Sequence, residues 1–457
     1  MKVLNTPLNK QLFKMTLPML AGLLAIMGCQ LVDSAFIGQL GPSPLTALGF
    51  TLPIYQLIIG VQVGLGIATT SVISIALGEQ SIHKARQLAG LVILLGFVLI
   101  VSLCFLIWYR QSTIVLLLGA KQDIFPLIHE YWLPWLISCF LGAMLYFGYS
   151  IFRAYGETLL PGILMVVTSL LNIILDPILI FVLDMGLAGA AWATCIAFGL
   201  GCLILYMQMI KREFLALPIN RKQASEGLKR ILSFLTPSML SQFIPPLSAM
   251  LATVMISSHG DFAVAAWGLG SRLELFSIII VLALTMALPP IIGKLRGSHS
   301  FSEIHQLVKT SIRFVLIWQF IVFLVLIVLS PLIGNLFTDN RQIINILNSY
   351  LWSVPLSFGA LGVCMVMVSV CSALGTPRTS LIISIVRLFA CYLPLLWIGS
   401  ELAGPSGLFI GAMLGNFLAG YLSWCIYKNR IRSLNFYENR RSFYAPTNYT
   451  KMDEKIS

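Results

Sequence analysis

The sequence is poor in charged residues and lacks the motifs on which many enzymes depend. Of its 457 residues only 10% are charged, whereas 58% are hydrophobic. A soluble domain carries about 25% charged residues, so this composition excludes a water-exposed globular protein. The chain contains no HExxH, GxGxxG or P-loop sequence, and its five histidines form no pattern with acids. A multispan membrane enzyme is therefore a remote alternative, and we expect no catalytic residue.

Metal-binding and disulfide patterns are also absent. The nine cysteines lie within or at the ends of apolar segments, and none belongs to a CxxC pair. Such cysteines usually pack as small apolar residues, so we expect neither a zinc site nor disulfide bonds. We expect no cofactor other than a coupling ion, H⁺ or Na⁺.

What the sequence does contain is a series of long apolar runs. The runs 88–108, 312–329 and 389–398 require surrounding hydrocarbon. The first run lacks a small-residue cleavage pattern, which favours a retained helix over a signal peptide. We predict an all-α membrane protein with twelve transmembrane helices at 12–36, 45–76, 88–109, 127–152, 160–183, 187–210, 230–257, 262–292, 309–337, 345–373, 379–399 and 405–427.

The distribution of Lys and Arg predicts the orientation in the membrane. The net charge of +12 alone would be compatible with nucleic-acid binding. However, 24 of the 29 Lys and Arg residues fall in the tails, in alternate loops and at the adjoining helix ends. This asymmetry follows the positive-inside rule, so we expect both termini to be cytoplasmic in a multi-pass protein of the bacterial inner membrane. We therefore expect membrane lipids to be partners of the protein, and no nucleic-acid partner.

The chain contains an internal repeat with a shift of 219 residues. This shift superposes Pro18 on Pro237 and Gly78 on Gly297. Two six-helix halves that begin on the same side of the membrane are parallel repeats, related by a pseudo-twofold axis along the membrane normal. We therefore predict an N-lobe over 1–210, a cytoplasmic linker over 211–229, a C-lobe over 230–427 and a polar, irregular tail over 428–457.

Two acids lie deep within predicted helices of the first half. Asn172 and Asp176 are four residues apart, so they share one face of the fifth predicted helix. Pro177 follows directly and cannot donate a backbone hydrogen bond, which frees the carbonyl of Ile173. The second acid, Asp33, lies in the first helix. Because the repeat places apolar residues at the equivalent positions of the second half, we predict ion chemistry in the N-lobe alone.

Carboxylates inside a membrane are costly, so Asp33 and Asp176 are predicted to be functional. Two carboxylates in one apolar cavity cannot both ionise cheaply, so one of them can hold a proton near neutral pH. Alternatively, the two carboxylates with the oxygens of Asn172 and Thr194 form a hard-oxygen site suited to Na⁺. The residue types leave both coupling ions open, and we favour the proton.

Five short sequences occur in order along the predicted helices: TLP at 16–18, DSAFIG at 33–38, FRAYGE at 152–157, NIILD at 172–176 and GLAGAAWAT at 186–194. Together they resemble the multidrug and toxic compound extrusion (MATE) transporters, and within them the DinF-like branch. The resemblance implies a cation or proton site at Asp33, Asn172, Asp176 and Thr194, and a first helix that bends at Pro18. It also implies export of amphipathic, often cationic drugs or toxins by alternating access. The tenth predicted helix has no acid, which argues against the NorM-like branch.

Other polar and aromatic side chains are candidates for supporting roles. Arg272 and Glu274 are two residues apart, so they do not share a helix face and each needs a partner elsewhere. With Arg387 they are predicted to form an inter-helix polar network. Four residues are candidates for lining the substrate cavity, with packing as the alternative: Tyr146, Tyr149, Met27 and Met165.

Two rival transport functions fit the sequence less well. A lipid or lipid-linked saccharide flippase of the same superfamily would need several cations to hold a pyrophosphate, and the predicted N-lobe helices contain only Lys14, at the start of the first. A channel would not need a single asymmetric acid site. We therefore predict a gradient-driven exporter that works as a monomer. Neutralisation of Asp33 is expected to let the first helix bend at Pro18, which shrinks the lobe cavity and expels the substrate.

Overall fold

The computed structural model describes residues 7–119, 124–218 and 220–444, which form helices and connecting turns with no β-strand among them. The first half contains α1 (Pro7–Gln39), α2 (Pro42–Gly78), α3 (Ile82–Tyr109), α4 (Gln111–Leu117), α5 (Phe125–Tyr155), α6 (Leu159–Pro177), the π-helix η3 (Ile178–Val182) and α7 (Gly186–Lys211). The second half contains α8 (Arg221–Ser257), α9 (Asp261–Ser277), α10 (Ile279–Gly297), α11 (Phe301–Phe337), α12 (Arg341–Ser353), the 3₁₀ turn η4 (Val354–Ser357), α13 (Phe358–Ala373), α14 (Pro377–Ile385), the π-helix η5 (Val386–Tyr392) and α15 (Leu393–Tyr444).

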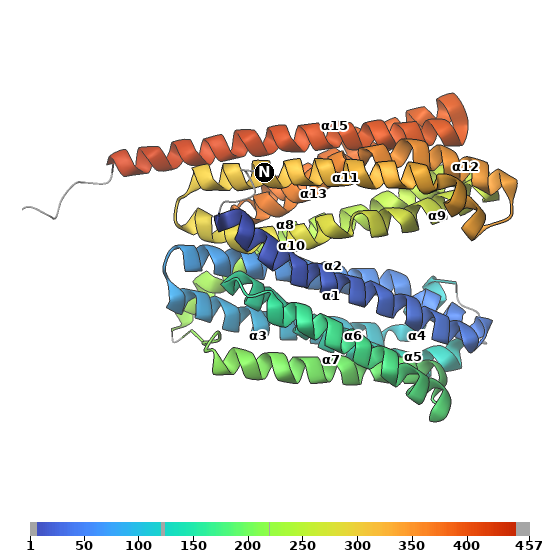
Figure 1. Ribbon diagram of the computed structural model, residues 1–457. Helices are drawn as coiled ribbons and strands as arrows, with labels where there is room; N and C mark the ends of the chain where they lie inside the picture. Colours follow the sequence, from blue (N-terminus) through green and yellow to red (C-terminus); the bar gives the residue numbers. More distant parts are fainter. Residues whose placement is uncertain (1–6, 120–123, 219, 445–457) are drawn as a thin grey trace, which may run out of the picture.

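The helices form two lobes that lie side by side (Figure 1). Helices α3, α6 and α7 lie on one side of the molecule and α11, α13 and α15 on the other, with α1, α2, α8 and α10 between them. Each lobe has its own apolar clusters, centred on residues such as Phe147 and Trp132 in the N-lobe and Val366 and Tyr350 in the C-lobe. Large apolar side chains also cover the outside, as expected for helices that face lipid.

Twelve membrane spans result once the last helix is divided. Within the described residues, eleven helical segments are long and apolar enough to cross a membrane, and the last of these is Pro377–Phe436. That segment turns back on itself at Gly404, whose φ of 59° is accessible to glycine at little cost. Gly407 and Gly411 then pack directly against the backbone of Gly399 and Leu395. The segment therefore supplies two antiparallel spans, and the predicted all-α fold of two six-helix lobes is confirmed.

The repeat is visible in the backbone conformation as well as in the sequence. Gly41 and Gly260 precede α2 and α9 with φ of 108° and 93°. Gly156 and Gly375 end α5 and α13 with φ of 93° and 81°. Each pair is separated by 219 residues, so the same left-handed turn residue recurs at the same place in both lobes.

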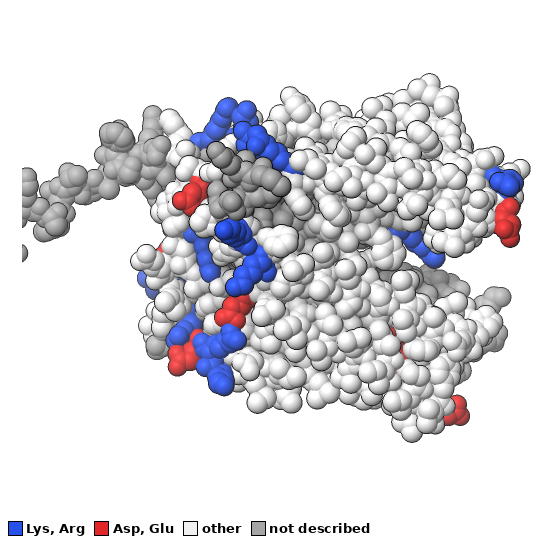
Figure 2. All heavy atoms as spheres, in the orientation of Figure 1, with Lys and Arg blue, Asp and Glu red and all other residues white. Residues whose placement is uncertain are grey.

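The two lobes exchange the beginnings of their first helices. Leu12 and Met15 of α1 belong to an apolar cluster of the C-lobe, whereas Ile231 and Phe234 of α8 belong to the largest cluster of the N-lobe. Leu12 and Met15 correspond to Ile231 and Phe234 in the 219-residue repeat. These contacts lie at the end of the molecule where Lys and Arg side chains gather, here called the basic end (Figure 2).

The lobes touch at the basic end and separate toward the opposite end, here called the far end. A Cβ placed on Gly78 of α2 would lie 2.2 Å from the carbonyl oxygen of Lys294 in α10. At the far end, by contrast, a Cβ on Gly49 of α2 or Gly268 of α9 would meet no atom within 4 Å. Figure 2 shows the surface hollowed between the lobes at this end. The protein is thus closed at the basic end and open at the far end.

Several helix boundaries differ from the predicted ones. The eighth predicted helix is divided into α9 and α10 at Ile278, and the short α4 was not predicted. The linker predicted over 211–229 is non-helical over 212–218 and helical from Arg221, because α8 already begins there. The irregular tail predicted from 428 is wrong over its first part, since α15 continues to Tyr444; residues 445–457 lie outside the described residues.

Candidate functional site

The residues singled out in the first lobe converge where α1 packs against α6. Cys29 and Asp33 are four residues apart on α1, and the Sγ of Cys29 lies 3.7 Å from Asp33 Oδ1. The same thiol donates to Asn172 Oδ1 of α6 at 2.8 Å. Asn172 in turn donates through Nδ2 to Asp176 Oδ1 at 3.3 Å, because the two side chains share one helix face as predicted.

Asn172 connects three helices in either orientation of its amide. In one orientation Nδ2 donates to the hydroxyl of Thr194 in α7 at 3.3 Å, while Oδ1 accepts from Cys29. With the amide turned over, the nitrogen donates to Asp33 Oδ1 at 3.3 Å and the oxygen accepts from the backbone N–H of Thr194 at 3.2 Å. The structure therefore brings together all four residues predicted for the ion site.

Asp176 is fully buried, whereas Asp33 is half-buried. The Oδ2 atom of Asp176 has no hydrogen-bond partner within the described residues. The two carboxyl groups lie close enough to interact electrostatically. Two carboxylates at this separation repel each other, so a shared proton or a cation would relieve the repulsion. In the described part of the chain, no group of three or more His, Cys, Asp or Glu side chains is placed to hold a metal ion.

The backbone of α6 changes form beside the site. Pro177 cannot donate to the carbonyl of Ile173, and directly after it the chain widens into the π-helix Ile178–Val182. Gly189 of α7 packs against this segment so closely that a Cβ there would lie 2.7 Å from the carbonyl oxygen of Leu179. The irregular turn thus sets the distance between α6 and the segment of α7 that carries Thr194.

The predicted hinge residue, Pro18, lies in a continuous helix in this structure, because α1 runs unbroken from Pro7 to Gln39. Gly162 of α6 packs directly on it, and a Cβ at that position would lie 2.5 Å from the carbonyl oxygen of Pro18. Met165, one turn further along α6, is buried against Gly22 of α1. This position favours packing over cavity lining for Met165, whereas Met27 is only half-buried.

The two tyrosines predicted to line the cavity lie on α5, within the N-lobe. Tyr149 is buried in the largest apolar cluster of that lobe, so its position favours packing. Tyr146 is half-buried and lies against Gly66 of α2. The guanidinium of Arg153 lies 5.1 Å from the centre of the Tyr146 ring, a cation–π contact at the basic end of α5.

The polar network predicted in the C-lobe forms without one of its members. The hydroxyl of Tyr350 donates to Glu274 Oε2 at 3.4 Å, and Arg387 lies close enough to act electrostatically on Glu274. Arg272 is exposed and has no ion pair or hydrogen bond to another described residue. Glu274 and Arg387 thus lie together as predicted, while Arg272 takes no part in this contact.

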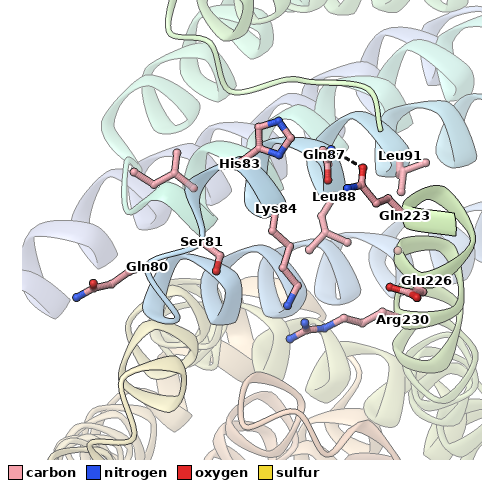
Figure 3. Close-up of a pocket in the computed structure, with 12 residues that line it drawn as sticks. Gln80, Ser81, His83, Lys84, Gln87, Leu88, Leu91, Gln223, Glu226 and Arg230 are labelled. Carbon is pink, nitrogen blue, oxygen red and sulfur yellow. Dashed lines mark hydrogen bonds between the residues drawn. The ribbon is translucent and has the colours of Figure 1, made fainter. Parts of the chain in front are cut away.

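A pocket of about 780 Å³ lies at the basic end between the beginnings of α3 and α8, far along both lobes from the acids (Figure 3). Gln87 donates to Gln223 across it at 3.2 Å. Below this hydrogen bond Lys84 and Arg230 converge, and both pair with Glu79 at 2.9 and 3.5 Å. Because these contacts join α2 and α3 to α8, the pocket belongs to the closed basic end rather than to the ion site.

Sequence reasoning missed Cys29. Its thiol lies between Asp33 and Asn172, but a cysteine within an apolar helix is most simply interpreted as a packing residue. The available signal was its spacing, because Cys29 lies four residues before Asp33 and therefore on the same face of α1.

Comparisons with known proteins agree with the repeat and the fold. A family model described as MatE matches the chain twice, over residues 18–178 and again over 237–398. The FAD transporter of Shewanella oneidensis is 30% identical over 92% of this chain and 94% of its own. The multidrug export protein MepA of Staphylococcus aureus is 25% identical over 92% of this chain and 94% of its own.

A solved structure matches across nearly the whole chain. The crystal structure of the Vibrio cholerae MATE transporter VcmN in the bent form superposes with a TM-score of 0.91 at 50% identity, covering 94% of this chain and 98% of that one. The two matches of the family model begin 219 residues apart, which is the repeat shift found in the sequence. The chain therefore belongs to the MATE family, whose members are membrane transporters and not enzymes.

Proposed function

We propose that this protein exports amphipathic, often cationic organic compounds in exchange for H⁺ or Na⁺, by alternating access. The observation that carries the proposal is the convergence of Asp33, Asn172, Asp176 and Thr194 from three helices. Buried acids in a membrane span that face one another need a proton or cation between them, and binding and release of that ion can be coupled to a conformational change. We favour the proton.

Asn172 supplies a mechanism for this coupling. An ionised Asp33 favours the amide orientation whose nitrogen donates to it, at 3.3 Å. A neutral Asp33 loses that preference, and the amide oxygen can then accept from Cys29 at 2.8 Å. The exchange loosens the connection between α1 and α6, which we propose lets α1 bend at Pro18. One charge that moves through 100 mV supplies about 2.3 kcal/mol for the cycle.

The basic end is proposed to be cytoplasmic, following the positive-inside rule, so the open far end faces outward across the bacterial inner membrane. In that orientation the structure represents the state that releases substrate and accepts the coupling ion from outside. We further propose a monomer surrounded by lipid. Membership of the DinF-like branch is supported by the confinement of the ion-site acids to the N-lobe.

Transport into inverted membrane vesicles tests this function. Ethidium uptake is measured with an acid interior or a Na⁺-loaded interior, each imposed separately. We expect Asp33→Asn and Asp176→Asn to lower uptake at least about tenfold at equal expression, because neither amide can exchange a proton. Asp184→Asn is the matched control, since Asp184 is exposed after η3 and its φ of 51° is also accessible to Asn. Uptake at the unmutated rate in both site variants would refute the proposal.

A second candidate function is export of FAD or a related dinucleotide. It is favoured by the 30% identity to the Shewanella oneidensis FAD transporter over 92% of this chain. A dinucleotide carries phosphates as well as a flat ring, so it needs a positive group in the substrate cleft. The acids of the N-lobe do not supply one.

A further inference from the structure

The C-lobe contains an arginine that the proposed ion site does not use. Arg272 lies in α9, about a third of the way from the far end of the eighth span that α9 and α10 form together. Its side chain is exposed and unpaired among the described residues. A guanidinium that faces lipid at such a depth is costly, so an exposed arginine there is expected to face water. The water-accessible space beside α9 is the hollow between the lobes (Figure 2).

Helical spacing independently places Arg272 on the side that faces the N-lobe. Gly293 of α10 packs against α2, and Met286 packs against the main apolar cluster of the N-lobe. Met286 lies seven residues before Gly293, and Arg272 lies fourteen residues before Met286. Seven residues make almost two whole turns with a drift of about 20°, and three such steps drift by about 60°, so the three side chains lie on one broad face. Gly268, one turn before Arg272, lies where the lobes have separated.

The break between α9 and α10 does not disturb this register. The N–H of Ile278 donates to the carbonyl of Glu274 at 3.0 Å, and the N–H of Leu282 donates to the carbonyl of Ile278 at 2.9 Å. Both are bonds between residues four apart, so the helical path continues across the break.

The positive charge of Arg272 is not neutralised within its own lobe. Glu274 lies on a different helix face and already has Tyr350 and Arg387 as partners. The N-lobe acids Asp33 and Asp176 belong to the ion site within their own lobe, where Asp176 is fully buried. Arg272 therefore keeps an exposed positive charge with no ion-pair partner among the described residues.

We propose that Arg272 binds the anionic group of the transported compound, and that phosphate-bearing amphipathic compounds belong to the substrate class. A guanidinium donates paired hydrogen bonds that match the oxygens of a phosphate, whereas a lysine contributes only a point charge. This inference rests on the proposed export function and adds a substrate class to it. The ion site in the N-lobe drives export, and Arg272 selects among the compounds exported.

Flavins provide matched probes, because riboflavin, FMN and FAD share one ring system and differ in their phosphates. The purified full-length protein is reconstituted in lipid vesicles, and initial rates are measured for these three compounds and for ethidium. We expect Arg272→Gln to lower FAD and FMN transport at least about tenfold while riboflavin and ethidium change less than about twofold. Arg272→Lys should give an intermediate loss. Arg341→Gln is the control, since Arg341 is exposed at the start of α12.

Each remaining outcome contradicts the inference. Equal losses for all four probes would show that Arg272 acts in the conformational cycle and not in anion recognition. An unmutated protein that transports ethidium but neither FMN nor FAD would also refute it, yet would leave the proposed export function intact. Loss of that function is distinguished by Asp33→Asn, which should stop all four compounds alike. If Arg272 recognised only the phosphates of lipids, the vesicles would show movement of phospholipid without transport of FAD. That result would contradict a soluble phosphate-bearing substrate.

Discussion

Gly78 and Gly297, which occupy the same position in the two halves of the repeat, are in direct contact: a Cβ on Gly78 would lie 2.9 Å from the Cα of Gly297. Ser74 and Gly293, one turn earlier in each half, form a second such pair, and a Cβ on Gly293 would overlap the Ser74 hydroxyl. Residues related by a twofold axis can touch only on that axis. The closed basic end is therefore built around the axis of the molecule, where both lobes have small residues.

This contact predicts that Gly78→Val prevents full closure of the basic end. Its first added atom would lie 2.2 Å from the Lys294 carbonyl oxygen, and backbone cannot give way cheaply. Overpacking of this kind costs about 1–3 kcal/mol, which shifts the balance between the two states about 5- to 150-fold toward the state open at the basic end. Double electron–electron resonance across that end should show the longer distance. Gly199→Val is the control, because its first added atom meets only Leu141 at 3.9 Å.

The ion pairs of Glu79 are expected to make a small, pH-dependent contribution to the stability of the closed basic end. Partial burial alone would raise the pKa of Glu79, but hydrogen bonds and charges from Lys84 and Arg230 outweigh it and hold the pKa below its ordinary value. The ion pairs of Glu79 with Lys84 and Arg230 are therefore fully formed above the ordinary glutamate pKa of about 4.3. They are lost as pH falls through the lower pKa that Glu79 has in the folded protein. Between pH 5 and pH 8 Glu79 stays ionised, so its titration should not change how far the basic end closes.

Glu79→Gln removes both ion pairs at once. Since the partners are partly exposed, we expect a shift of no more than about 1 kcal/mol toward the state open at the basic end. The shift should become smaller in high salt, because exposed ion pairs are screened. A large effect that persists in high salt would show that Glu79 acts through something other than these two pairs.

Gly162→Ala tests the contact at the proposed hinge. The new methyl group would lie 2.5 Å from the Pro18 carbonyl oxygen, so α1 and α6 must move apart where they are most closely packed. We expect a loss of about 1–3 kcal/mol in stability, seen as a lower thermal midpoint in detergent. Transport should fall as well, because the same displacement separates Asp33 from Asn172. Gly38→Ala on α1, where no atom lies within 4 Å of the added methyl, should leave both quantities unchanged.

Two small substitutions at Cys29 are expected to differ in their effect on transport. Cys29→Ser keeps a donor within reach of Asn172, whereas Cys29→Ala removes it. A hydrogen bond of this kind contributes about 1 kcal/mol, so we expect transport by the alanine variant to fall about fivefold and that of the serine variant to remain near normal. Equal rates in both variants would show that the thiol acts only by its volume.

The sequence predicted the arrangement of this protein where the signal repeats over many residues. Apolar runs and the bias of Lys and Arg predicted twelve spans, and repeated residues such as Gly78 and Gly297 predicted the two lobes. The side chains of Asn172 and Asp176 were predicted to share a face because four-residue spacing on a helix requires it.

Other features depend on contacts that spacing does not encode. Nothing in the local sequence indicates that Cys29 lies against Asn172, since 143 residues separate them. The polar composition after residue 428 favoured an irregular chain, yet α15 continues to Tyr444, because an existing helix adds further residues more easily than a new one forms. The sequence is also compatible with both open states, and only the packing of Gly78 against α10 shows which one is present.

The exchange of helix beginnings between the lobes has a consequence for assembly. Leu12 and Met15, from the first half of the chain, complete an apolar cluster of the C-lobe. Ile231 and Phe234, from the second half, lie in the largest apolar cluster of the N-lobe. Each half would leave a hydrophobic gap if it were made by itself. Two separately synthesised halves should therefore recruit one another inside the bilayer and restore a working transporter without any covalent link, as identical subunits do when they swap arms.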